Sequence, residues 1–360
     1  MSVPAMADEQ PPDWRLLAPH RPLSPGDDAY VARPTSGGDV ISTWVIAGGS
    51  TVLVSGPTGV GKSTELARAT EALKSTRAAC LMQIDRMANM HRLSADELMH
   101  MIANGIVAFA RDQLNLRVSD KLASFQTGGV NAARIAAMEV ERLSQQGRLA
   151  LLVDGLEKLR PGPSAREIFD ALSSLPDSVD LIVVIPWHAA FGGGTESIIR
   201  PGEHLHRVAA LDTQGEEAAA TADFFGRVLA RRLRSVDRMP KSMPPLMARA
   251  FVASGGIPRV FLQLMADAGT YARAKRGDVW PDRIDLSDAI ADQEQSFRRA
   301  LLPGDTKAIT EVIGTDGREL DLERRIRLLA QGILLERVRG GRMYLEAHPL
   351  VARAIQDSRS

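Results

Sequence analysis

The chain has 360 residues, of which 44% are hydrophobic and 24% charged, so it is long enough to bury a sizeable core in two or three packed units. Lysine plus arginine and aspartate plus glutamate both total 44, which excludes the globally basic balance of a protein that coats nucleic acid or an acidic membrane. The single cysteine, Cys80, excludes an intramolecular disulfide and a cysteine-based metal cluster, and we expect it to be a buried core residue.

The N-terminal stretch MSVPAMADEQPPDW has no basic region followed by an apolar one, so no signal peptide is expected. The longest apolar run, LIVVIPWHAAF, is too short to span a bilayer as a helix. We therefore expect a cytoplasmic protein without a membrane partner. Residues 1–28 are rich in proline and contain a PGDD turn, which predicts an irregular arm.

Residues 29–212 alternate short β-rich runs with helical segments, which predicts an α/β unit with a parallel sheet covered by helices. The predicted strands are, in order, STVLVS, AACLMQID, LALLVD, DLIVVIP and HRVAAL. Between the second and third strands, two amphipathic helices are predicted, ADELMHMIANGIVAFARDQL and NAARIAAMEVERLSQQ, joined by FQTGGV.

Residues 213–295 are predicted to form a helical subdomain, because the strand pattern stops and helical patterns follow one another. The helical segments are EEAAATADFFGRVLARRL, PPLMARAFVAS and PRVFLQLMADAGTYARAK. Residues 296–360 change again: ERRIRLLAQ indicates a helix, and ILLERVR and RMYLEA indicate two strands with Gly340 and Gly341 in a hairpin turn. Helices followed by a two-stranded wing predict a winged-helix domain.

The strongest motif lies between the first strand and the helix after it, in SGPTGVGKSTE. Its spacing fits G-x-x-x-x-G-K-[ST], a phosphate loop whose backbone N–H groups and following helix N-terminus hold phosphate oxygens. In such a loop Lys62 is expected on the β- and γ-phosphates, Ser63 on Mg²⁺, and Thr64 in support of the loop. The expected nucleotide-binding residues are Gly56, Pro57, Thr58, Gly59, Val60, Gly61, Lys62, Ser63 and Thr64.

A second signal is the acid at the end of LALLVD. Asp154 is predicted to be the second Mg²⁺ ligand, although such an aspartate is often only a helix N-cap. Glu157, three residues later, is a candidate for polarising water, and an exposed first-turn glutamate is the alternative interpretation. His188 follows the fourth strand and is either a γ-phosphate sensor or a structural histidine. His204 and His206 alternate as on a strand, but no third ligand lies nearby, so no metal site is predicted there.

With these motifs and SGGIPRVFLQL in view, residues 30 to 360 resemble the AAA+/STAND group of P-loop ATPases, including origin-recognition-type initiators and NACHT-like switches. The resemblance implies ATP as the nucleotide, and no guanine-reading NKxD motif is present. YVARP is similar to the arginine-containing box that precedes the ATPase core and lies near the adenine. LLVDGLEKL is similar to the NACHT-like form rather than to the adjacent Asp-Glu pair of AAA+ motors.

In this group GGIPR resembles the lid element that brings an arginine or the proline backbone onto the nucleotide, and this implies a sensing role for Arg259. A solvated first-turn arginine is the alternative. Such proteins also complete their sites with an arginine from a neighbouring subunit in a homo-oligomer, and Arg200 is a candidate for that role, with an ordinary surface arginine as the alternative.

Three functions remain open on the sequence. The favoured one is an ATPase switch whose nucleotide state controls binding to a separately encoded partner protein. The second is a DNA-binding ATPase that uses its winged helix, and a small-molecule kinase is the third. Acids interleaved in the C-terminal segment, Glu319, Asp321, Glu323 and Glu336, weaken the DNA hypothesis, because phosphate tracking favours an uncompensated cationic face. The arginines there are Arg318, Arg324, Arg325, Arg327, Arg337, Arg339 and Arg342.

Overall fold

The computed structural model describes residues 12–17, 23–34, 37–116, 128–160, 162–191, 199–200, 202–234, 239–277, 279–315, 319–339 and 342–357. The chain divides into two compact units. We call residues 36–56 and 62–208 the sheet unit, and residues up to 35, 57–61 and 209 onward the helical unit. None of the described helices is both long enough and apolar enough to cross a membrane.

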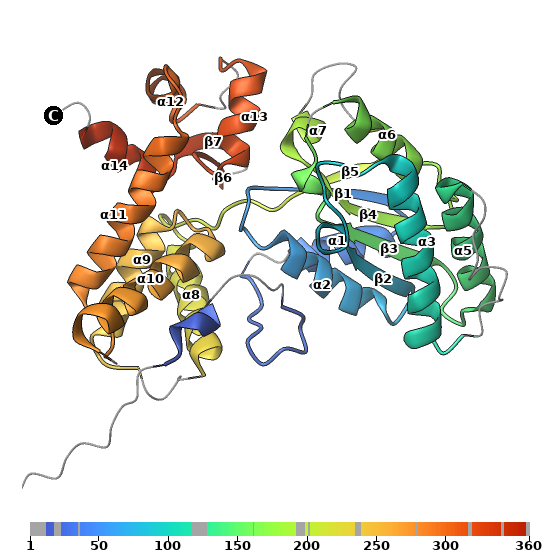
Figure 1. Cartoon of the computed structure of the whole chain (residues 1–360), viewed down its shortest axis with the longest axis horizontal. Helices are drawn as coiled ribbons and strands as arrows, with labels where there is room; N and C mark the ends of the chain where they lie inside the picture. Colours follow the sequence, from blue (N-terminus) through green and yellow to red (C-terminus); the bar gives the residue numbers. More distant parts are fainter. Residues whose placement is uncertain are drawn as a thin grey trace, which may run out of the picture. The chain divides into compact units, whose positions relative to one another are not determined.

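The sheet unit holds a five-stranded parallel sheet with the strand order β2-β3-β4-β1-β5. The strands are β1 (Thr51–Ser55), β2 (Ala78–Gln83), β3 (Leu149–Asp154), β4 (Asp180–Val184) and β5 (His204–Arg207). The helices are α1 (Gly37–Ile46), α2 (Lys62–Leu73), α3 (Ala95–Asp112), α5 (Gly129–Leu143), α6 (Pro163–Leu172) and α7 (Trp187–Phe191), with short 3₁₀ turns η2 (Ile84–Arg86) and η3 (Leu156–Lys158) (Figure 1).

Strands β1 to β4 are largely buried on both faces, as continuous apolar runs predict for a parallel sheet, whereas the edge strand β5 is partly exposed. On one face, Leu151, Val153 and Val183 join a single core with α3, α5 and α6. The alternate positions Val52, Val54 and Ile182 are also buried and lie outside that core, in keeping with the two-residue period of a strand. Cys80 belongs to the first core, and its burial raises the pKa of the thiol to about 12.

The described elements of the helical unit are, in chain order, η1 (Trp14–Leu17), α8 (Ala218–Leu233), α9 (Met243–Ala253), α10 (Pro258–Arg276) and α11 (Arg283–Ala300), followed by the C-terminal part. Phe225 lies at the centre of an aromatic cluster, with ring centroids 4.8 Å from Phe261 and 5.2 Å from Phe251. The C-terminal part is winged-helix-like, and the strands β6 and β7 form an antiparallel hairpin. Its elements are α12 (Asp305–Val312), α13 (Leu322–Ala330), β6 (Leu334–Arg339), β7 (Arg342–Ala347) and α14 (Pro349–Asp357).

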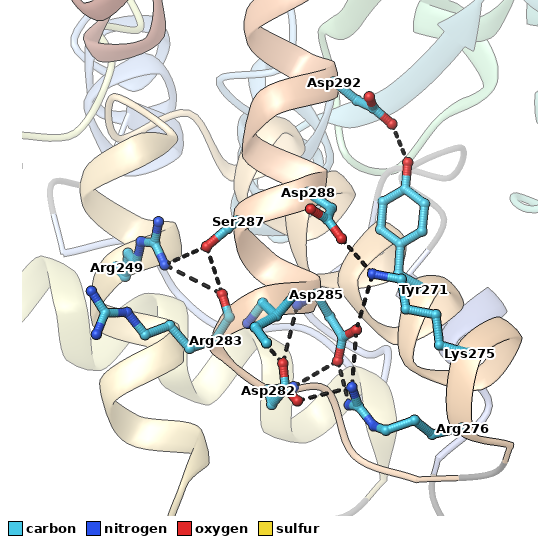
Figure 2. A network of polar contacts seen from close by, with 11 residues as sticks. Arg249, Tyr271, Lys275, Arg276, Asp282, Arg283, Asp285, Ser287, Asp288 and Asp292 are labelled. Atoms are coloured by element: carbon cyan, nitrogen blue, oxygen red, sulfur yellow. Dashed lines mark hydrogen bonds and ion pairs between the residues drawn. The ribbon is translucent and has the colours of Figure 1, made fainter.

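Polar contacts join α10 to α11 along one flank (Figure 2). Asp285 is fully buried and is bound by Arg276, and it also completes a capping box with Asp282 at the start of α11. Further along the same flank, Lys275 pairs with Asp288 and the Tyr271 hydroxyl donates to Asp292. These contacts fix α11 against the helix that begins at Pro258.

Two expectations need correction. The arm 1–28 is not irregular throughout, because Trp14 and Leu17 are buried in η1 against α10. A Cβ on Gly269 of α10 would lie 2.1 Å from the Trp14 ring, so the glycine makes room for the indole. The fifth strand is His204–Arg207 rather than HRVAAL, because Leu211 has left the sheet and its N–H donates to Gly256.

The α/β fold, the succession of helices after the sheet and the C-terminal hairpin are as predicted. The four-part division at residues 28, 212 and 295 stays a prediction. Residues 125–127 of FQTGGV, the turn at Gly340 and Gly341, and Arg318 lie outside the described residues.

Candidate functional site

The ends of the phosphate loop belong to the sheet unit. β1 lies between β4 and β5, and the chain turns from it at Gly56, where a Cβ would be 2.3 Å from the Val208 carbonyl oxygen. A side chain cannot be accommodated there, which accounts for the first glycine of the motif. α2 begins at Lys62, whose side chain is 5% exposed and whose Nζ donates to the Gly56 carbonyl oxygen at 2.9 Å. The ammonium is therefore turned back into the loop.

The middle of the loop, residues 57–61, is held by other parts of the helical unit. Gly59 and Gly61 have φ angles of +86° and +105°, which a curled glycine-rich loop requires. The Gly59 carbonyl accepts from the Arg259 backbone N–H at 3.3 Å, and the Val60 carbonyl accepts from Arg33 Nη1 at 3.0 Å. These contacts use carbonyl oxygens and so do not occupy N–H groups of the curled loop, although the Val60 N–H donates to the Pro57 carbonyl at 3.5 Å within it.

Asp154, the last residue of β3, is 4% exposed. Burial raises its pKa to about 6; a hydrogen bond from Ser63 opposes that shift, and the nearby charges of Glu157 and Asp85 add to it. Among the described residues Asp154 Oδ1 has no hydrogen-bond partner, and neither has the buried Glu157 Oε2. Buried carboxylate oxygens without partners are costly, so this arrangement favours a bound cation or an ordered water.

Sequence reasoning missed Asp85 and Lys158. Lys158 pairs with Asp85, and a Cβ on Gly155 would lie 2.8 Å from Asp85, so this ion pair lies beside the Asp154 turn. The signal was present, because AACLMQID ends an apolar run in an acid just as LALLVD does. The structure places Asp85 in η2, directly after β2, and β2 pairs with β3.

The remaining candidates are spread over the fold. Arg259, the second residue of α10, has an exposed side chain, and His188 lies in α7 just after β4. Arg200 pairs with Asp170 at 2.9 Å. His204 and His206 face one side of β5, and the His204 ring stacks on Trp44 at 4.1 Å. Within the described ranges, no group of three or more His, Cys, Asp or Glu residues is placed to hold a metal ion.

The chain matches no family model and no curated protein. It does resemble solved structures. A Walker-type ATPase of Pyrococcus abyssi matches with a TM-score of 0.58 and 13% identity, over 95% of this chain and 99% of that one.

Two further structures are similar at lower scores. The Orc1 protein of Aeropyrum pernix in complex with DNA has a TM-score of 0.49 and 16% identity, and 98% of each chain is covered. Drosophila ORC bound to DNA has a TM-score of 0.45 and 14% identity, over 99% of this chain and 94% of that one. The fold assignment rests on the Pyrococcus structure, because the other scores fall below 0.5. The chain has the fold of a Walker-type ATPase.

Proposed function

We propose that the protein binds and hydrolyses ATP and acts as a nucleotide-controlled switch for a partner protein. The observation that carries the proposal is a complete G-x-x-x-x-G-K-S loop in which the buried Lys62 ammonium faces the loop interior and Ser63 hydrogen-bonds the buried acid that ends β3. A phosphate group in the loop would replace the Gly56 carbonyl as the partner of Lys62. The surrounding N–H groups would bind its oxygens, as in other phosphate loops.

The residues present fit Mg²⁺. Asp154 carries a buried oxygen without a partner among the described residues, and the Ser63 hydroxyl lies against the same carboxylate. Mg²⁺ at a nucleotide site takes one or two protein oxygens and completes its shell with phosphates and water, so a larger ligand cluster is not required. When bound, the ion neutralises charge on the β- and γ-phosphates.

The chain's own groups supply the rest of the proposed chemistry. Lys62 stabilises negative charge on the phosphates, and Asp154 holds Ser63 and the metal shell in register. Glu157, with its buried oxygen, is the group that would orient the attacking water. Arg259 is the group that would report the γ-phosphate to the helical unit, since its backbone already contacts Gly59.

The contacts of Arg327 and Arg337 favour a switch over DNA binding. Arg327 donates to both oxygens of the buried Asp305, and Arg337 is buried in internal contacts. Cations engaged in this way do not form the uncompensated face that phosphate tracking needs. DNA binding through the winged helix remains the alternative, and a salt-dependent DNA-binding titration with and without ATP tests it.

The test of nucleotide binding is Lys62→Ala, compared with Lys74→Ala, an exposed lysine that pairs with Glu71. We expect Lys62→Ala to weaken ATP binding by at least about tenfold, because a charge-assisted contact contributes roughly 1.5–3 kcal/mol, while the folded structure is retained. Lys74→Ala should bind as the wild type does. Equal affinity in Lys62→Ala and the wild type, measured by calorimetry, would rule out the phosphate-loop assignment.

A second variant addresses hydrolysis. Asp154→Asn keeps the shape of the side chain but removes the charge that holds the metal shell, so we expect nucleotide binding with loss of Mg²⁺-dependent turnover. Asp177→Asn, an exposed aspartate of the same unit, is the control. Turnover that survives in Asp154→Asn would show that another acid has this role.

A further inference from the structure

The C-terminal hairpin is tied to the α9–α10 turn by a buried arginine. Arg337 of β6 is 2% exposed, and its guanidinium makes three contacts. Nη1 donates to the Leu211 carbonyl at 2.6 Å, Nη2 to the Gly255 carbonyl at 2.8 Å, and Nε to Glu346 at 3.1 Å. The guanidinium thus bridges two backbone segments, and its negatively charged partner is Glu346 on β7.

The same turn is enclosed on a second side by His348. This residue is fully buried, its Nε2 lies 3.1 Å from the Ser254 carbonyl oxygen, and its Nδ1 accepts from the Leu350 N–H at 3.3 Å. A carbonyl can only accept, so Nε2 carries the proton and the ring is neutral. The pKa of His348, lowered by burial to about 3, agrees with this assignment.

The turn has no room to shift against the segment after the sheet. A Cβ on Gly256 would lie 1.7 Å from the Leu211 carbonyl oxygen, and the Leu211 N–H donates to the Gly256 carbonyl at 3.0 Å. Arg337 binds that same Leu211 carbonyl. The hairpin, the turn and residue 211 therefore form one packed junction within the helical unit.

The other end of this junction contacts the phosphate loop. Three residues after Gly256, the Arg259 N–H donates to the Gly59 carbonyl, and a Cβ on Gly59 would be 2.6 Å from Arg259 Cβ. Since Pro258 fixes the backbone between them, the position of the turn sets the position of Arg259. A continuous line of described contacts runs from Glu346 through Arg337 and the turn to Gly59.

We propose that Arg337 is a positioning residue for the nucleotide site: it holds the 254–258 turn so that Arg259 meets the phosphate loop, and it makes the C-terminal hairpin part of the nucleotide-sensing apparatus. This inference rests on the proposed ATP binding. Under the DNA-binding hypothesis, Arg337 would be one of the arginines that contact phosphates. The present inference gives it a structural role inside the protein instead. Arginine is required because its planar fork reaches two carbonyls at once, whereas a lysine ammonium is a single compact charge.

The experiment uses the full chain with Arg337→Lys and Arg337→Met, and with Arg299→Met as a matched loss of an exposed arginine. ATP and ADP affinities are measured by calorimetry, and the fold by thermal melting. We expect the ATP preference over ADP to fall about tenfold in both Arg337 variants, as loss of one charge-assisted contact implies. Arg299→Met should keep the wild-type ratio.

The outcomes separate this inference from the proposed function. If the wild type binds no ATP, the proposed function fails first. If the wild type binds ATP and a folded Arg337→Lys keeps the wild-type ratio of affinities, Arg337 does not position the site.

If neither Arg337 variant folds, hydrogen exchange of the wild type decides. Adding ATP must then slow exchange in residues 334–337 and 344–347 together with residues 257–261. If ATP slows exchange in residues 257–261 but not in residues 334–337 and 344–347, the proposal is overturned.

Discussion

At the scale of single residues, His348 has both ring nitrogens in use inside the core. Burial lowers its pKa to about 3 in the folded protein, from 6.5 for an unperturbed histidine. Below pH 6.5 the unfolded chain therefore binds a proton that the folded chain does not bind. The contribution of the neutral ring to stability is complete above pH 6.5. It is lost as the pH falls toward 3, at about 1.4 kcal/mol per pH unit at most.

We therefore expect His348→Gln, which cannot titrate, to be less stable than the wild type at pH 7 and to approach it as the pH falls to 4. Urea unfolding at four pH values measures this difference, with the exposed His91→Gln as the control for loss of a histidine. A stability difference that stays constant from pH 7 to pH 4 would contradict a buried, neutral His348.

Prediction from sequence could single out the motif between Gly56 and Ser63 and the acid that ends an apolar run at Asp154, and the roles of these residues at a nucleotide site stay predictions. It could not find the partners of Arg33 or Arg337, because these are backbone carbonyls far away in the chain. Part of the signal for Arg337 was present. Leu335 and Arg337 lie two residues apart on β6 and so share one face, which the structure buries together with Leu334 and Glu336 on the other face.

At the scale of elements, the junction of α10 and α11 depends on Asp285 more than on its neighbours (Figure 2). Asp285 is fully buried, whereas Asp288 is 46% exposed. We expect Asp285→Ala to destabilise the protein by about 3–5 kcal/mol, because it removes the buried partner of Arg276 and half of the capping box. Asp288→Ala should cost about 1 kcal/mol or less, as exposed pairs do. Denaturant unfolding followed by tryptophan fluorescence compares the two, and equal losses would contradict the assigned role of burial.

The elements that were predicted best from the sequence are those in which every apolar residue is buried within the same strand or helix. LALLVD is β3 without a shifted boundary, because the run is buried in the sheet on both faces. HRVAAL placed the fifth strand too late in the chain. His206 and Arg207 belong to β5, but Val208, Ala210 and Leu211 are buried after β5 has ended, and burial alone does not say which element covers a residue. α11 was not predicted, because its apolar stripe of Leu286, Ala289, Ile290 and Phe297 lies among many charges.

At the scale of the whole molecule, we expect Arg259 to couple nucleotide state to shape. Arg259→Ala keeps the backbone N–H that binds Gly59 and removes only the guanidinium, so ADP affinity should stay within about twofold. Loss of a γ-phosphate contact of roughly 1.5–3 kcal/mol should abolish the difference in protease sensitivity between the ATP and ADP forms. Arg273→Ala, an exposed residue of the same helix, is the control. If the protease sensitivity of Arg259→Ala still differs between the ATP and ADP forms as in the wild type, Arg259 does not couple nucleotide state to shape.

The strand order also determines when the phosphate loop can form during synthesis. β1 leaves the ribosome early, yet its neighbours in the sheet are β4 and β5, and Val52 to Ser55 pair with residues 204 to 207, about 150 positions later. At roughly 5–20 residues per second, the first strand waits on the order of 10 s for its partners. Until then the apolar run TVLVS has no neighbouring strand to pair with. The phosphate loop that follows it is therefore not yet formed, and a ligand of the loop cannot stabilise the nascent chain.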